Sequence, residues 1–252
     1  MSRLSDSMAG YSPNVADFDN DGNLDLFVAS YGPNFLFHND GNGKFTDVAS
    51  ALGVLGGDEA TPSNWGDYDN DGLPDLYVSS YLLHPLNEHD FLYHNAGDHF
   101  SEAIPAQMLA NGATHGVQWA DYDGDGALDL AMCNNNPGGH NHLWHNDLPP
   151  ERAQRSIQVM VVDARGRYTK AGSEVRVYAT GTRKVLGTRL VDTGSGYCSQ
   201  NVMPVHIGLS SAGRVDVEVT SMSKSGRKIT RVAGVDPNQL PRRILTVKVR
   251  ED

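Results

Sequence analysis

Asp67-Tyr-Asp-Asn-Asp-Gly-Leu-Pro-Asp-Leu76 is the second of three copies of one pattern, Asp-x-Asp-x-Asp-Gly-x-x-Asp-Leu. The first copy begins at Asp17 and the third at Asp121, so their starts lie 50 and then 54 residues apart. A second pattern repeats in step with the first, as Phe35-Leu-Phe-His-Asn39, Phe91-Leu-Tyr-His-Asn95 and His142-Leu-Trp-His-Asn146. Two patterns with one period indicate a repeated supersecondary unit.

Each repeat is expected to contain about four short strands joined by turns. An apolar run follows each aspartate pattern, and the aromatic-His-Asn pattern, a Gly-rich turn and a strand beginning at Phe45 or Phe100 come next. Four such strands are the content of one propeller blade. The third repeat is cut short after Asn146. The sequence therefore predicts an all-β fold with a propeller-like repeat domain of about three blades.

An incomplete propeller poses a problem of exposed sheet edges, because closed propellers usually need about four to eight blades. Three arrangements would solve it. The C-terminal half could pack against the open side, two chains could form a ring as a homodimer, or the arrangement could be a minimal open one.

The aspartate pattern places carboxylates at positions 1, 3, 5 and 9 and glycine at position 6. Ca²⁺ prefers such hard oxygen ligands, as in EF-hand loops, although the glutamate at position 12 is missing here. Four carboxylates so close together repel one another unless a dication binds. We therefore expect about three Ca²⁺ ions. The predicted ligands are the side chains of Asp17, Asp19, Asp21, Asp25, Asp67, Asp69, Asp71, Asp75, Asp121, Asp123, Asp125 and Asp129 and the carbonyls of Asn23, Leu73 and Ala127.

Other interpretations of these loops remain open. A single acidic turn with glycine is often only solvated, but three in-phase copies favour metal binding. Mg²⁺ is the weaker option because it needs near-octahedral geometry. Zinc would require a cluster such as His140, His142 and His145 in surroundings that are rich in oxygen ligands instead.

The charge of the chain changes sign near residue 150. Residues 1–150 hold 22 acidic residues against Arg3 and Lys44, a net charge of −20, whereas residues 151–252 have a net charge of +9. This shift suggests two domains, 1–150 and 151–252, whose opposite charges attract across an interface. The basic residues are spread rather than clustered with aromatic residues, which argues against nucleic-acid binding.

The second half is expected to be an antiparallel β-sandwich. Seven short runs rich in β-branched residues are separated by Gly, Ser, Asp and Pro. They are 157–162, 174–179, 185–191, 205–209, 215–219, 228–232 and 244–249.

The repeats, over about residues 13–146, resemble the FG-GAP or VCBS type of integrin α-chains and many bacterial extracellular proteins. The resemblance implies a propeller with calcium in its loops and a role in adhesion or as a scaffold. Residues 155–250 resemble the ASPIC/UnbV domain at Arg167-Tyr-Thr-Lys-Ala-Gly-Ser-Glu-Val-Arg-Val177, Thr193-Gly-Ser-Gly-Tyr-Cys-Ser-Gln200 and His206-Ile-Gly-Leu209. The sequence departs from that family at Ser221-Met-Ser-Lys-Ser-Gly226, where a Trp-Pro-Ser-Gly turn is typical.

Histidines are the remaining candidates for chemistry. His38, His94 and His145 recur in the same slot of each repeat, which favours a structural hydrogen bond over catalysis. His115 is the best candidate for a unique general base, with Tyr81, Glu88 or Asp90 as partners. The hydrolase, phosphate-loop, zinc-protease and dinucleotide motifs are absent.

Two functions remain. The first is a calcium-binding interaction or scaffold module for a protein, glycan or small-molecule ligand. The second is a small calcium-dependent biosynthetic enzyme, of the cyclase or isomerase type, with its active site between the domains. A buried pocket lined by aromatic residues such as Tyr31, Trp65, Tyr81 and Trp119, with an acid or histidine of shifted pKa, would favour the enzyme.

Hydropathy and cysteine content bear on location and redox state. No run is long and apolar enough for a membrane span, and the start has no secretory signal. A cytoplasmic location is therefore expected, or an extracellular one if a leader has been removed. Cys133 and Cys198 could pair or remain free.

Overall fold

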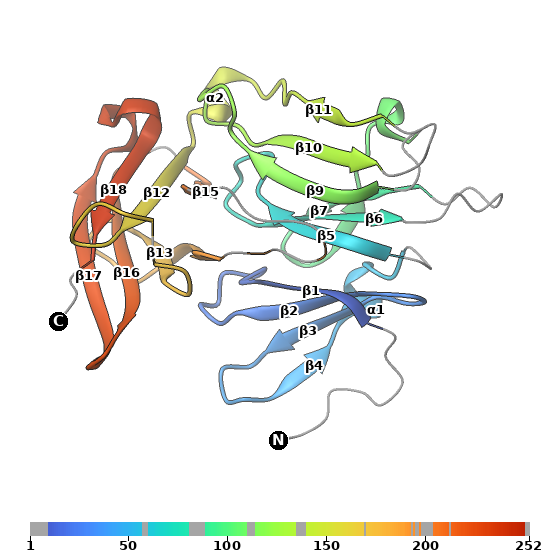
Figure 1. Ribbon diagram of the computed structural model, residues 1–252, viewed down its shortest axis with the longest axis horizontal. Helices are drawn as coiled ribbons and strands as arrows, with labels where there is room; N and C mark the ends of the chain where they lie inside the picture. The colour runs from blue at the N-terminus through green and yellow to red at the C-terminus, as the bar shows by residue number, and fades with distance from the viewer. Residues whose placement is uncertain are drawn as a thin grey trace.

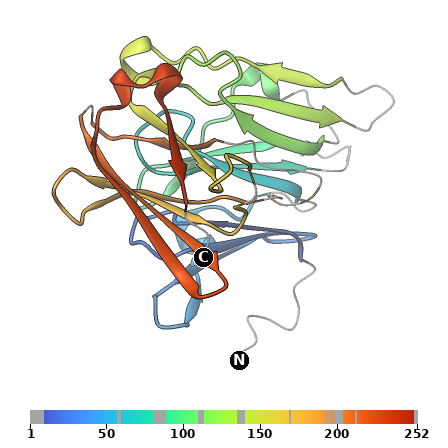
Figure 2. The same cartoon turned by 60° about the vertical axis from the view of Figure 1, so that its left-hand side comes forward.

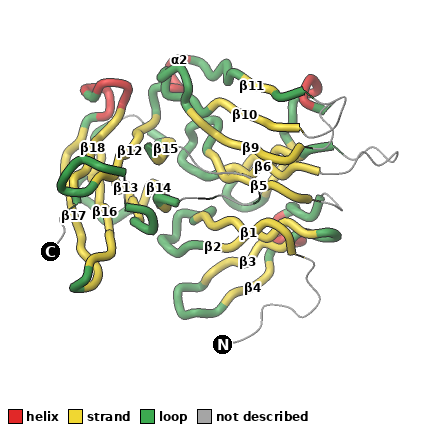
Figure 3. The backbone as a smooth tube through the Cα atoms, in the orientation of Figure 1, coloured by secondary structure: helices red, strands yellow, loops and turns green. Residues whose placement is uncertain are grey.

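The structure is a computed structural model that describes residues 10–56, 60–80, 89–109, 114–134, 140–168, 170–192, 194, 197, 204–211 and 213–249. Strands and connecting loops make up nearly all of it (Figure 3). No described helix is long and apolar enough to cross a membrane.

The repeats form three antiparallel sheets, each in chain order (Figure 1). The first two contain four strands and the third contains three, as the sequence predicts. Their strands are β1 (Gly10–Ala16), β2 (Asp25–Ser30), β3 (Phe35–Asn39) and β4 (Phe45–Asp47); β5 (Ala60–Gly66), β6 (Asp75–Ser80), β7 (Phe91–Asn95) and β8 (Phe100–Glu102); and β9 (Thr114–Ala120), β10 (Asp129–Asn134) and β11 (His142–Trp144). Short helices follow in places: α1 (Ala49–Leu52), η1 (Ala106–Met108) and α2 (Pro150–Ala153).

The first strands of the three sheets, β1, β5 and β9, are neighbours. Asn14 Nδ2 of β1 donates to Ser63 O of β5 at 2.8 Å, and Asn64 Nδ2 of β5 donates to Val117 O of β9 at 3.2 Å. The corresponding residue of β9 is Gln118, whose Nε2 is buried and has no hydrogen-bond partner among the described residues. The series of amide links therefore ends at β9.

Apolar residues between adjacent sheets hold the repeats together. One buried cluster joins the first and second sheets and includes the edge-to-face rings of Phe27 and Trp65, whose centroids lie 6.2 Å apart. A second cluster joins the second and third sheets around Tyr77 and Trp119. Burial of such aromatic residues is the main stabilising contribution here.

All seven strands predicted for the second half are present. They form a three-stranded sheet, β15-β12-β18, and a four-stranded sheet, β14-β13-β16-β17, which share one apolar cluster. The sandwich was expected to be antiparallel, which is wrong for one pair, because β12 and β18 run parallel. The strands are β12 (Ser156–Val162), β13 (Glu174–Ala179), β14 (Val185–Leu190), β15 (Val205–Gly208), β16 (Val215–Ser223), β17 (Gly226–Val235) and β18 (Ile244–Lys248), with η2 (Pro237–Gln239) and η3 (Pro241–Arg243) before β18.

The protein is thus all-β, and it is built from five small sheets. A count of three blades and a separate C-terminal sandwich remain predictions. Figures 1 and 2 show the C-terminal sheets standing against the ends of the repeat sheets where β1 turns into β2, β5 into β6 and β9 into β10. Tyr197, which lies between β14 and β15 in the chain, makes ring contacts with Tyr11 of β1 and His115 of β9. A residue of the C-terminal half therefore contacts both the first and the third repeat sheet, and how the remaining sheet edges are covered stays a prediction.

Candidate metal centres and the junction between the halves

The three aspartate loops connect β1 to β2, β5 to β6 and β9 to β10, and all three fold alike. Position 9 of each pattern is the first residue of the next strand. The backbone N–H at position 6 donates to the carboxylate at position 1, at 3.1 Å for Gly22, 2.9 Å for Gly72 and 3.1 Å for Gly126. These glycines have φ values of 91°, 99° and 100°, a region that glycine enters without strain.

The backbone N–H at position 7 donates to the carboxylate at position 5 in every loop, from Asn23, Leu73 and Ala127. The same short sequence pattern therefore produces the same turn in all three repeats. The use of the carbonyls of Asn23, Leu73 and Ala127 as metal ligands stays a prediction.

The predicted ligands converge in the described loops. Carboxylate oxygens at positions 1, 3 and 9 lie within 4.8 Å of one another in the first loop, Asp17, Asp19 and Asp25, and in the second, Asp67, Asp69 and Asp75. Ca–O distances of about 2.3–2.6 Å allow two ligands to be at most about 5 Å apart, so both sets fit one ion. Asp17 Oδ1 is buried and has no hydrogen-bond partner among the described residues, which leaves one oxygen available for a cation.

Burial gives these loops an electrostatic reason to bind a cation. It raises the pKa of Asp17 to about 6, of Asp25 to about 7 and of Asp75 to about 6. The pKa of Asp67 is raised well above its ordinary value for the same reason. A bound dication would favour the charged form of each carboxylate.

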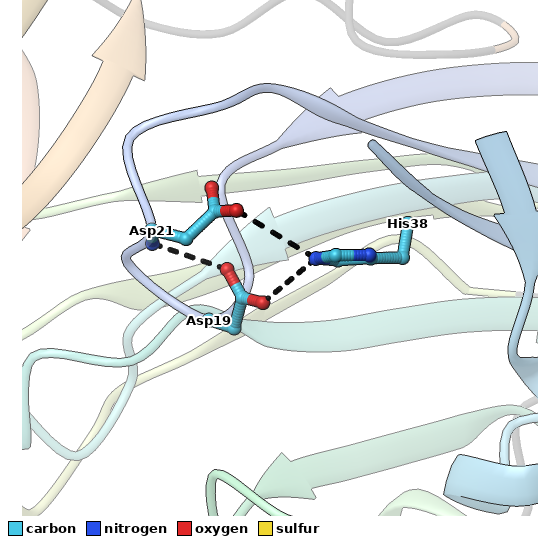
Figure 4. Close-up of side chains that lie close together, drawn as sticks. All are labelled: Asp19, Asp21 and His38. Atoms are coloured by element: carbon cyan, nitrogen blue, oxygen red, sulfur yellow. Dashed lines mark hydrogen bonds and ion pairs between the residues drawn. The ribbon is translucent and has the colours of Figure 1, made fainter. Parts of the chain in front are cut away.

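Each repeated histidine reaches its own loop, a contact that the sequence analysis missed. His38 Nε2 lies 3.1 Å from Asp19 Oδ2 and 3.7 Å from Asp21 Oδ2 (Figure 4). His94 lies 3.2 Å from Asp75, and His145 lies 3.1 Å from Asp123. The sequence predicts a structural role for these side chains. Their shared position in the repeat was the only sequence signal for the contact with the loop.

The asparagine that follows the histidine connects strand and loop in every repeat, and in the second and third repeats it also reaches the neighbouring sheet. Asn95 N donates to Asp75 Oδ1 at 2.9 Å, and Asn95 Nδ2 donates to Phe18 O of the first repeat at 2.8 Å. Asn146 makes the same two contacts one repeat later, to Asp129 and Tyr68. The position-9 carboxylate is therefore held in place by backbone donors, with lone pairs left for a metal.

Position 4 of the pattern links the loops to one another. Asn20, with φ 58°, donates through Nδ2 to Gly72 O at 2.9 Å, and Asn70, with φ 57°, donates through Nδ2 to Gly126 O at 2.9 Å. In the third loop position 4 is Gly124, and Arg242 of the C-terminal half lies against it.

Basic side chains of the C-terminal half contact all three loops. Arg176 donates to Gly22 O in the first loop. In the second loop Arg152 pairs with Asp69 at 3.0 Å, and in the third Arg243 Nη1 donates to Asp125 O at 3.0 Å. The opposite charges of the two halves thus meet at the loops, as the charge distribution suggests.

A cavity of about 210 Å³ lies at this junction. Trp65, Trp119 and Asp121 line it from the repeats, and Arg189, His206 and Arg242 line it from the C-terminal half. Burial lowers the pKa of His206 to about 4, so its ring is neutral. Gly126 O can only accept a hydrogen bond, so the ring proton lies on His206 Nε2, 3.2 Å away, and Nδ1 is left without a described partner.

The remaining sequence candidates lie elsewhere. Tyr31 is exposed and packs its ring against Tyr11, not in the cavity. His115 is half-buried on β9, where its ring meets Tyr197. Its suggested partners Tyr81 and Glu88 lie outside the described residues. Of the proposed zinc ligands, His145 contacts Asp123 and Asp147, and the rings of His140 and His142 lie 6.5 Å apart. Cys133 is a free, exposed thiol, and Cys198 is outside the described residues.

Asp90 is a fully buried carboxylate outside the loops. It accepts hydrogen bonds from Tyr77 Oη, Ser80 N and Thr114 Oγ1 at 2.7–2.8 Å. Its carboxylate is therefore occupied by three hydrogen-bond donors.

Burial raises the pKa of Asp90 from 3.8 to about 6, which makes stability depend on pH. The folded protein holds this proton more tightly than the unfolded chain, so stability falls as pH rises from about 4 to about 6. Two pKa units correspond to about 3 kcal/mol. Urea unfolding of the wild type and of Asp90→Asn at pH 4 to 7 measures this effect. As the pH rises, the free energy of unfolding of the wild type should fall by up to about 3 kcal/mol relative to that of the variant. A difference that stays constant with pH would contradict this expectation, since lost hydrogen bonds alone give a constant offset.

Comparison with known proteins agrees with the repeats and the second half. No curated protein matches the chain. A solved structure of an Agrocybe aegerita lectin, described for its specific recognition of non-reducing terminal N-acetylglucosamine, is similar at 14% identity and a TM-score of 0.32, over 90% of this chain and 66% of that chain. The model of the FG-GAP-like repeat matches residues 9–78 and 82–132, and that of ASPIC and UnbV matches residues 165–249. The chain is therefore a β-propeller protein of FG-GAP-like repeats followed by an ASPIC and UnbV domain.

Proposed function

We propose that this protein binds calcium in its three aspartate loops and acts as an interaction or scaffold module. The observation that supports it best is that carboxylates of the first two loops converge within calcium-coordinating distance, and that all three loops share the hydrogen bond from position 6 to position 1. Because the C-terminal half rests on the same loops, calcium would also fix the two halves, 1–150 and 151–252, against each other. Calcium here has a structural role and does not contact the partner of the module.

Thermal unfolding after chelation tests this function. Adding Ca²⁺ should raise the melting temperature, because a ligand at 100 times its Kd stabilises the folded state by about 2.7 kcal/mol per site. The rise should be smaller in Asp71→Ala, which loses one carboxylate of the second loop. Asp98→Ala is the matched control, because Asp98 is exposed and lies outside the loops. An equal response to Mg²⁺, or none to Ca²⁺, would contradict the proposal.

A second candidate is a small calcium-dependent enzyme of the cyclase or isomerase type. The specific observation in its favour is the cavity between the halves, which Trp65 and Trp119 line together with two groups of shifted pKa. Burial raises the pKa of Asp121 and lowers that of His206. This function requires the cavity to admit a small molecule, and binding of a small molecule there can be measured without knowing the reaction.

A further inference from the structure

The cavity at the junction combines apolar walls with positive charge. Trp65 and Trp119 are almost fully buried, and Leu128 and Val205 extend the apolar lining. Arg189 and Arg242 supply the positive charge, while the Asp121 carboxylate on the same lining already accepts hydrogen bonds from Gln158 Nε2 and Gly126 N. Pockets of this composition, mostly apolar with a few placed polar groups, are typical of small-molecule sites at domain interfaces.

Arg189 lacks a counter-ion of its own. Among the described residues, no carboxylate lies within ion-pair distance of Arg189, and its Nη2 has no hydrogen-bond partner. Burial lowers its pKa, although the nearby carboxylates of Asp67, Asp17 and Asp75 act in the opposite direction. Those three acids are the ones we assign to calcium, so this step rests on the proposed function. A Ca²⁺ ion in each loop would offset half of the charge of its four carboxylates, which would leave the partly buried Arg189 less fully compensated, and an anionic ligand would restore that compensation.

Arg242 is held in an unfavourable backbone conformation beside the cavity. Arg242 and Arg243 have φ values of 50° and 55°, a region that costs a non-glycine residue roughly 1–2 kcal/mol. The turn places the guanidinium of Arg242 against Gly124 of the third loop and along the cavity lining. Arg243 holds the turn by donating to Asp125 O. Backbone strain of this kind persists only where the surrounding structure holds the residue in place, and it is concentrated at functional sites.

We propose that the cavity binds a small aromatic carboxylate. Its carboxylate lies between Arg189 and Arg242, where planar guanidinium groups match a carboxylate in geometry and charge. Its ring lies along Trp65 and Trp119. A volume of about 210 Å³ corresponds to roughly seven water molecules, which suits a ligand of about ten non-hydrogen atoms. An inorganic anion would leave the apolar lining without contacts.

Isothermal titration of the calcium-saturated protein tests the site with benzoate and phenylacetate as probes. Their neutral isosteres, benzamide and phenylacetamide, serve as matched ligands. The carboxylates should bind at least about tenfold more tightly than the amides, because charge-assisted bonds to guanidinium groups discriminate between them. Equal affinity for both classes, or no heat with either at millimolar concentration, would overturn the proposal. Inorganic phosphate binding as well as benzoate would also overturn it.

Variants locate the binding. Arg242→Ala should weaken benzoate binding about tenfold, whereas Arg227→Ala, an exposed arginine away from the cavity, should not change it. Equal affinity in the wild type and Arg242→Ala would place the ligand elsewhere and refute the site. Calcium binding is read separately, from the melting temperature without probe. A calcium response without carboxylate selectivity would refute only the cavity, and selectivity without a calcium response would refute only the loops.

Discussion

Gly208→Ala should destabilise the protein by about 3 kcal/mol or more. Gly208 ends β15, and a Cβ there would clash with the Asp67 carboxylate and lie 2.8 Å from Asn70 Cα. The second loop cannot retreat easily, because Gly72 N donates to Asp67 Oδ2 at 2.9 Å. Overpacking usually costs about 1–3 kcal/mol, and a clash with backbone at a buried charge belongs at the upper end.

Urea denaturation of Gly208→Ala and of Gly213→Ala measures this cost. A Cβ at Gly213 would meet nothing within 4 Å, and its backbone needs no glycine, so that variant should stay within about 0.5 kcal/mol of the wild type. The calcium-induced rise in melting temperature should also shrink in Gly208→Ala, because the displaced carboxylate belongs to the second loop. Wild-type stability in Gly208→Ala would mean that β15 and the second loop do not pack together in solution.

The strands and the aspartate loops could be predicted because their information is local. Alternating apolar residues and the turn chemistry of Gly22, Gly72 and Gly126 determine each hairpin within a few positions. Repetition then strengthened each inference, because the same residues recur at one period. The absence of a fourth strand in the third repeat followed from the sequence in the same way.

The junction could not be predicted, since its contacts join residues far apart in the chain. Nothing near Leu186 or Gly208 in the sequence indicates that the second loop packs against them. The parallel pairing of β12 and β18 joins Gln158 to Ile244 and has no sequence pattern of its own. The acidic and basic halves predicted that the halves attract each other, but charge alone does not specify which surfaces meet. A pocket lined by residues such as Trp65 and Trp119 was named as the feature that would favour an enzyme, and the location of the cavity at the junction emerged only from the packing.

Asn70→Ala should cost about 3 kcal/mol, more than any other single change at position 4 of the loops. Asn70 is almost fully buried, and its Nδ2 lies 2.9 Å from Gly126 O, 3.2 Å from Arg152 O and 3.3 Å from Ala153 O. One amide therefore joins the second loop to the third and to the start of the C-terminal half. Alanine removes these bonds, worth about 1–3 kcal/mol, and adds left-handed strain of roughly 1–2 kcal/mol at a φ of 57°.

Two comparisons separate these contributions in urea unfolding. Asn70→Gly removes the amide without the strain, so it should be less destabilising than Asn70→Ala by about 1 kcal/mol. Asn20→Ala carries the same strain, at φ 58°, but loses only the bond to Gly72 O. It should therefore cost about 2 kcal/mol. Equal losses in Asn20→Ala and Asn70→Ala would show that neither the contacts to Arg152 O and Ala153 O nor the deeper burial of Asn70 adds to the cost, because the strain is common to both variants.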